Sequence, residues 1–78
     1  MELIIRGPTE CITKTIQWLE IRTTQGSLVI QNGHAPVIAL LPAQDIIFQT
    51  TEDIIESIAI SKSIMEVTRQ TISLLLTT

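Results

Sequence analysis

The chain has 78 residues, a formal net charge of −3 and one cysteine. This length allows a single domain, residues 1–78, with a thin core, because a domain of about this size buries only about 60% of its unfolded surface. One cysteine excludes an intrachain disulfide, and the scarcity of lysine and arginine, together with the absence of tyrosine, argues against nucleic-acid binding.

The composition favours an all-β fold. Isoleucine, valine and threonine make up more than a third of the residues. These β-branched side chains suit a pleated sheet better than a helix. Short apolar runs separated by turn residues recur along the chain, so we predict a two-sheet β-sandwich of about eight to ten short, mostly antiparallel strands.

In chain order, the strand-like segments share short length and apolar alternation. They are residues 2–6, 10–16, 17–24, 27–30, 37–41, 44–51, 53–61, 63–67 and 71–76. In the third segment, Leu19 and Ile21 alternate with Trp18, which would then point outward. Residues 52–67 also carry apolar side chains at loosely helical spacing, which leaves a helix as an alternative. The density of isoleucine there and the alternation over residues 57–61 favour strands.

Few residues carry reactive side chains or targeting signals. Cys11 lies on a predicted strand with only Lys14 as a basic neighbour, which indicates packing or inert surface. An acidic group of Glu52, Asp53 and Glu56 suggests either a metal site or a solvated hairpin tip, and the lack of a glycine-loop spacing favours the tip.

No apolar run approaches the roughly 18 residues of a membrane span, and no long apolar region follows the start as a signal peptide requires.

The segment from Gln25 to Leu41 holds the most unusual motif, Gly-His-Ala-Pro. Gly33 permits a backbone path closed to other residues, while Pro36 fixes its own φ and forces Ala35 into an extended conformation. A stiff corner with His34 at its tip is therefore expected between two strands. His34 either hydrogen-bonds its own turn or forms a contact surface, and the lack of a second histidine argues against a metal or catalytic role.

The stretch "GSLVIQNGHAPVIALL" resembles the signature of the F-type ATP synthase epsilon subunit, in its N-terminal β-sandwich domain. The residues that fall on the family pattern are Gly26, Ile30, Gly33, His34, Ala35, Pro36 and Leu40. Residues 64–67 resemble an Ile-Leu-Glu-Val-like run in the family's closing strands, so the resemblance covers the whole chain. Only the Gly-His-Ala-Pro core is distinctive.

The chain departs from the family pattern mainly at its turns. Asn32 replaces a proline before the corner, Ala43 replaces a glycine, residues 62–63 replace a glycine pair, and residues 69–70 replace Pro-Gly. The family commonly continues into two C-terminal helices that regulate ATP hydrolysis. Since the chain stops at Thr78, it resembles a short form without that helical hairpin.

The resemblance implies a non-catalytic rotor subunit of the central stalk, linking the gamma subunit to the c ring and coupling ion flow to ATP synthesis. It implies no cofactor, metal or small-molecule ligand, and contact with the membrane only through the complex, on the cytoplasmic side or its organellar equivalent. By position, it implies a ring-facing set and a gamma-facing set. These sets are Gly26, Ser27, Gly33, His34 and Ala35 for the ring, and Trp18 and Ala39 for gamma.

We expect Ser27 and His34 to lie at one end of the sandwich, brought together by bending at Asn32 and Gly33, with Trp18 on a side face. Trp18 is either an interface anchor or a side chain partly covered at the sheet edge. The alternative function is a free-standing β-sandwich adaptor outside the ATP synthase, which the genomic neighbours of the chain would distinguish.

Overall fold

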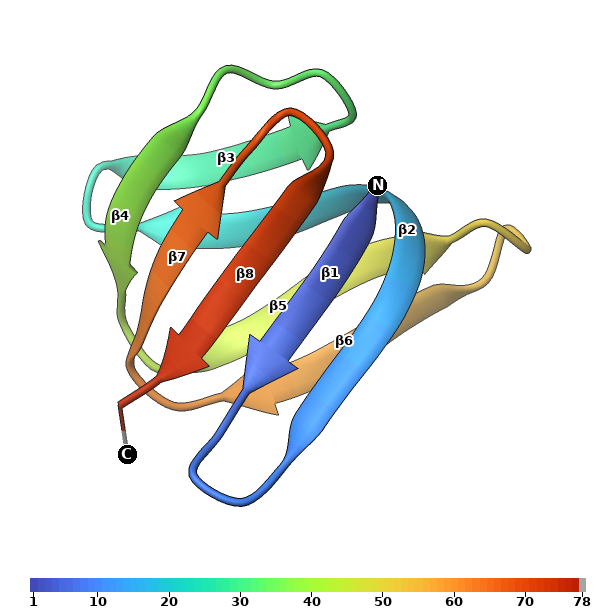
Figure 1. Cartoon of the computed structure of the whole chain (residues 1–78). Coiled ribbons are helices and arrows are strands. Elements are labelled where there is room, and N and C mark those ends of the chain that lie inside the picture. Colours follow the sequence, from blue (N-terminus) through green and yellow to red (C-terminus); the bar gives the residue numbers. More distant parts are fainter. Residues whose placement is uncertain (78) are drawn as a thin grey trace.

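The computed structural model describes residues 1–77, which form eight strands and no helix (Figure 1). The strands are β1 (Glu2–Arg6), β2 (Cys11–Thr23), β3 (Gly26–Gln31), β4 (Val37–Leu41), β5 (Gln44–Thr50), β6 (Ile55–Ile60), β7 (Ser63–Val67) and β8 (Thr71–Leu76). The predicted all-β class is confirmed. The helical alternative for residues 52–67 is wrong, because these residues form a turn followed by β6 and β7. No helix long and apolar enough to span a membrane occurs in the described residues.

Two sheets share strand β2. Sheet A has the order β4-β7-β8-β1-β2 and uses the first part of β2, while sheet B contains β3, the second part of β2, β5 and β6. All neighbouring strands are antiparallel except β1 and β8, which run parallel. Figure 1 shows β8 and β1 crossing in front of β5 and β6, the arrangement of a sandwich curled around one core.

Strand β2 passes from one sheet to the other through a β-bulge. Its ladder with β5 shifts register between Ile16 and Trp18, so Gln17 is an extra residue on β2. The bulge changes which positions point inward, and both Ile16 and Leu19 are buried although they are three residues apart. The two strands predicted at residues 10–16 and 17–24 are therefore one bent strand, and the predicted boundary coincides with the bulge.

The core consists of aliphatic side chains from every strand, together with one phenylalanine and one methionine. It comprises Leu3, Ile5, Ile16, Leu19, Ile21, Ile30, Leu41, Ile46, Phe48, Ile60, Met65, Val67, Ile72 and Leu74. Leu19 and Ile21 are buried while Trp18 is not, which confirms the predicted register of this part of β2.

The start of β6 differs slightly from its predicted position at residue 53. Asp53 has φ 63° and forms the tip of the β5–β6 turn. In that turn the Asp53 amide donates to Thr50 O at 3.1 Å, and the Thr50 amide donates to Ile54 O at 2.8 Å. The strand can begin only after this left-handed residue, at Ile55.

Candidate partner-binding surfaces

The β2–β3 turn carries two of the predicted ring-facing residues, Gly26 and Ser27. Gly26 has φ 125°, a conformation that L side chains rarely adopt. The turn is closed by the Thr23 hydroxyl, which donates to Gly26 O at 3.0 Å and accepts from the Gln25 amide at 3.1 Å. Gly26 and Ser27 are both exposed, so the turn presents a short polar tip to solvent.

The corner at residues 32–36 carries the other three, Gly33, His34 and Ala35. Gly33 has φ 86°, and its amide donates to Arg69 O at 3.0 Å in the β7–β8 turn. The His34 amide donates to Gln31 O at 3.1 Å. Main-chain hydrogen bonds from Gly33 and His34 thus fix the corner.

The imidazole of His34 bonds within the same corner. Its Nδ1 lies 2.7 Å from Ala35 O, and since a carbonyl oxygen only accepts, Nδ1 carries the proton in this bond. His34 is half-buried, whereas Gly33 and Ala35 are exposed. His34 thus makes the hydrogen bond expected within its own turn, and the exposed part of the corner at Gly33 and Ala35 consists of backbone and a small side chain.

The turn and the corner lie at opposite ends of β3. Ser27 pairs with Arg22, and Gln31 pairs with Trp18. Four residues of extended strand separate these pairs by roughly 13 Å. The expected bending that would bring Ser27 beside His34 does not occur, because β3 stays paired with β2 along its whole length. Both ends nevertheless belong to the same strand along one edge of sheet B.

The two predicted gamma-facing residues lie on different sheets. Trp18 lies on sheet B, where it is half-buried and its indole Nε1 donates to Gln49 Oε1 at 2.6 Å. Ala39 lies on β4 of sheet A, paired with Met65, and is half-buried on the inner side of that strand. These two residues therefore belong to separate surfaces.

An exposed apolar face that the sequence analysis missed covers the outer side of β4, β7 and β8. We call it the sheet A patch, and it consists of Ile38, Leu40, Ile64 and Leu75. Leu40 pairs with Ile64, which pairs with Leu75, so these side chains form one row across three strands. Ile38 and Leu40 are 71% and 75% exposed. Four aliphatic side chains on one exposed face are typical of an interaction surface.

The signal for this patch was present in the sequence. Strand β4 is apolar at all five positions, so any register must leave some apolar side chains on its outer face. Sheet B has a second, looser set of exposed apolar residues on its outer face, Val29, Ile47 and Ile55. Both sheets thus combine a buried inner face with a partly apolar outer face.

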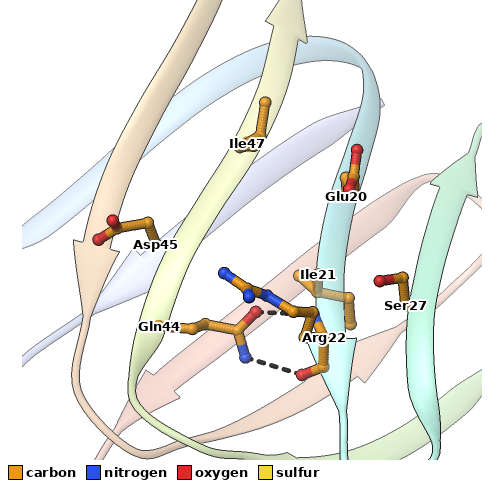
Figure 2. Close-up of a pocket in the computed structure, with 7 residues that line it drawn as sticks. All are labelled: Glu20, Ile21, Arg22, Ser27, Gln44, Asp45 and Ile47. Carbon is orange, nitrogen blue, oxygen red and sulfur yellow. Dashed lines mark hydrogen bonds between the residues drawn. The ribbon is translucent and has the colours of Figure 1, made fainter.

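A small hollow of about 170 Å³ lies on the outer side of sheet B (Figure 2). Its lining residues come from β2, β3 and β5 and are Glu20, Ile21, Arg22, Ser27, Gln44, Asp45 and Ile47. Within it, the Gln44 side chain bonds to the main chain of Arg22, as the dashed lines in Figure 2 show.

The acidic residues of the β5–β6 hairpin are engaged by neighbouring side chains. Asp53 accepts a hydrogen bond from Gln17 Nε2 at 2.9 Å, and Glu56 lies 3.6 Å from the Lys14 ammonium. No group of three metal-ligating side chains occurs among residues 1–77. Cys11 is exposed and lies opposite Arg6 in the β1–β2 ladder.

The fold is an eight-stranded β-sandwich of two curled sheets that share strand β2. A model of the family "ATP synthase, Delta/Epsilon chain, beta-sandwich domain" matches residues 3–78. The chain belongs to this family.

Two solved structures contain chains of similar fold. One is the mitochondrial ATP synthase central stalk and c ring of Tetrahymena thermophila, with 19% identity, a TM-score of 0.82 and coverage of 97% of this chain and 62% of that chain. The other is the mitochondrial ATP synthase of Euglena gracilis, described as OSCP, F1 and c ring, with 18% identity, a TM-score of 0.87 and coverage of 97% of this chain and 49% of that chain. The chain thus spans about half to three fifths of their length. No curated protein sequence matched it.

Proposed function

We propose that this chain is a rotor subunit in the central stalk of an F-type ATP synthase, where it links the gamma subunit to the c ring. The observation that carries this proposal is the family match over residues 3–78. The sandwich of similar fold in two ATP synthase assemblies, one of them described as central stalk and c ring, supports it. The complex is membrane-associated, and we assign the chain to the side on which the stalk lies, cytoplasmic or its organellar equivalent.

The proposed role is mechanical and non-catalytic. A rotor subunit has to transmit torque without deforming, which requires a close-packed interior and complementary contact surfaces. Buried side chains from all eight strands and a strand shared by both sheets supply that stiffness here. We propose no cofactor, metal or small-molecule ligand.

For the c ring, we propose the exposed turn at Gly26 and Ser27 together with the corner at Gly33, His34 and Ala35. Two features support this assignment. Both loops are polar, main-chain-rich and held by the hydrogen bonds described above, which makes them stiff contact points for the polar loops of a ring. They lie along the same edge strand, so a ring surface that contacts both must span the length of β3.

For the gamma subunit, we propose the outer face of β4, where Ile38 and Leu40 of the sheet A patch flank Ala39, whose own side chain lies on the inner side of the strand. An apolar centre of this kind is what a protein–protein interface needs, and a typical specific interface buries about 800 Å² per partner. Trp18 is proposed as a second contact with gamma on sheet B. Because the two residues lie on different sheets, their contributions can be measured separately.

The chain, tagged and expressed in its own organism, should co-purify with ATP synthase subunits from detergent-solubilised membranes. Mass spectrometry of the captured complex is expected to identify gamma and the c subunit. One observation favours the alternative function, a free-standing adaptor: several glycines of the family pattern are absent from the turns of this chain. Recovery of partners that include no ATP synthase subunit would support the adaptor and contradict the stalk assignment.

A further inference from the structure

The second half of β2 extends beyond its partner β5. The β2–β5 ladder ends at the pair Glu20–Ile47, while β2 continues to Thr23. β2 pairs with β3 from Trp18 to Thr23, and from Ile21 onward it no longer pairs with β5. Residues 21–28 therefore form a two-stranded arm that ends in the turn at Gly26, with Ile21 buried in the core at its base. An arm of two strands is only marginally stable by itself, and its position depends on what holds its base and sides.

Where the main chain of β5 no longer pairs with β2, the side chain of Gln44 forms the hydrogen bonds to β2 instead (Figure 2). Its Oε1 accepts from the Arg22 amide at 2.7 Å, and its Nε2 donates to Arg22 O at 2.8 Å. Both main-chain groups of one residue are bonded to one neighbour, which is the pattern of a hydrogen-bonded antiparallel pair. The primary amide has the donor and acceptor that a peptide group would supply, so the side chain extends the ladder by one residue pair.

The same side chain also joins the arm to the β4–β5 connection. Gln44 Nε2 donates to Pro42 O at 3.1 Å, and the Gln44 main chain pairs with Ile60 of β6. One residue therefore links three parts of the chain: the arm, the connection from sheet A and strand β6 at the other edge of sheet B. The charged side chains around the hollow, those of Glu20, Arg22 and Asp45, take no part in these three hydrogen bonds.

We infer that Gln44 is a positioning residue that fixes the direction of the β2–β3 arm and thereby of the turn at Gly26 and Ser27. This inference rests on the proposed function, because it gives the ring-facing turn its rigid support. The turn's own bonds lie within residues 23–26 and hold its shape but not its direction. The Gln44 bonds are the ones that tie the arm to β5.

The bonds themselves can be tested on the full chain by nuclear magnetic resonance. The Gln44 side-chain amide protons should exchange with solvent more slowly than those of exposed Gln70, and a scalar coupling should connect the Arg22 amide to the Gln44 side-chain carbonyl. Gln44→Met keeps the length of the side chain and removes the amide. It should lower exchange protection of the Arg22 amide by roughly three- to tenfold, the ratio that corresponds to one lost hydrogen bond. Gln70→Ala, in the β7–β8 turn, is the control and should change nothing in the arm.

Unchanged protection of Arg22 in Gln44→Met, or Gln44 amide protons that exchange as fast as those of Gln70, would overturn the inference.

The role in the stalk has a separate readout. In an assembled ATP synthase, Gln44→Met should weaken coupling between hydrolysis and ion pumping while the affinity for gamma stays unchanged. If the arm loosens but coupling is unaffected, Gln44 does hold the arm, and the proposed c-ring contact of the turn at Gly26 and Ser27 is wrong. If wild-type chain fails to bind gamma at all, the stalk assignment fails, and the resonance experiment still decides whether Gln44 holds the arm.

Discussion

Ser63 places a hydroxyl inside the sandwich, at the point where β7 begins between Leu41 of β4 and Leu76 of β8. The residue is 2% exposed, and its Oγ has no hydrogen-bond partner within the described part of the chain. A buried hydroxyl without a partner lowers stability by the cost of removing it from water. The position corresponds to a glycine in the resembled family pattern, so the hydroxyl is a local feature of this chain.

Replacing this side chain tests that cost. Ser63→Ala removes the hydroxyl and hardly alters the packing, so the free energy of unfolding is expected to rise by about 1 kcal/mol. Urea denaturation followed by tryptophan fluorescence measures it. Ser57→Ala, at an exposed position on β6, serves as the control and should leave the midpoint unchanged. A loss of stability in Ser63→Ala would mean that the hydroxyl makes a stabilising bond.

The glycines of this chain are required by backbone conformation at two positions and not at the third. At Gly33, with φ 86°, a Cβ would contact nothing within 4 Å, so the constraint is the dihedral angle alone. Gly33→Ala is expected to cost about 1–2 kcal/mol, the penalty of a left-handed conformation. Gly7→Ala is the matched control, because a Cβ there meets Glu10 Cγ at an ordinary 3.5 Å. Equal thermal midpoints for the two variants would contradict this explanation of the corner.

At the scale of elements, the bulge at Gln17 decides which residues of β2 reach the core. Deleting Gln17 removes the extra residue, so either Ile16 or Leu19 must turn outward. We expect the deletion variant to lose its cooperative unfolding transition. Gln17→Ala keeps the residue count and loses mainly the bonds to Asp53 and Thr50, so it should fold normally. Circular dichroism melting of both variants provides the comparison, and a well-folded deletion variant would show that the register is not fixed by the bulge.

The positions of several strands could be predicted from apolar residues that lie close together in the sequence. The pairing of the strands could not be predicted in this way. The segments at residues 2–6, 37–41, 63–67 and 71–76 match β1, β4, β7 and β8 in their bounds. The single strand β2 was divided in two because its bulge interrupts the alternation at Gln17. The parallel pairing of β1 with β8 joins the two ends of the chain, and nothing in local periodicity specifies that partner.

The candidate surfaces were predictable only in part, for a related reason. Glycine and proline marked the turn and the corner, since their backbone requirements can be recognised in the sequence. The separation of Ser27 from His34 depends on how far β3 stays paired with β2, and the Gln44 bonds depend on where β5 diverges from β2. The sheet A patch requires three strands to be adjacent and in register. These features arise from long-range pairing, which composition and spacing do not determine.

At the scale of the whole molecule, the contribution of Trp18 to gamma binding can be measured separately from that of the sheet A patch. Trp18 lies on sheet B and is only half-buried, outside the core cluster, so Trp18→Ala should leave the fold intact although it removes the bond to Gln49. We expect this variant to weaken gamma binding by more than about 1 kcal/mol if the indole is an interface anchor. Isothermal titration of the purified chain against gamma measures it. Collapse of the fold in this variant would instead identify Trp18 as part of the structural framework of sheet B.

A rotor subunit of the stalk must dock on the gamma subunit, and we propose that this chain does so through an apolar sheet face. The most direct test is the affinity of the purified full chain for the gamma subunit of the same organism, measured for wild type and for Leu40→Asp. Leu40 is 75% exposed, so the substitution should not disturb the core. Thr51→Asp, in the exposed β5–β6 turn away from sheet A, is the matched control. We predict a one-to-one complex with wild type, a loss of at least about tenfold in affinity with Leu40→Asp, which corresponds to about 1.4 kcal/mol, and no change with Thr51→Asp. A wild-type chain that forms no complex with gamma, or a Leu40→Asp variant that binds as tightly as wild type, would contradict the claim.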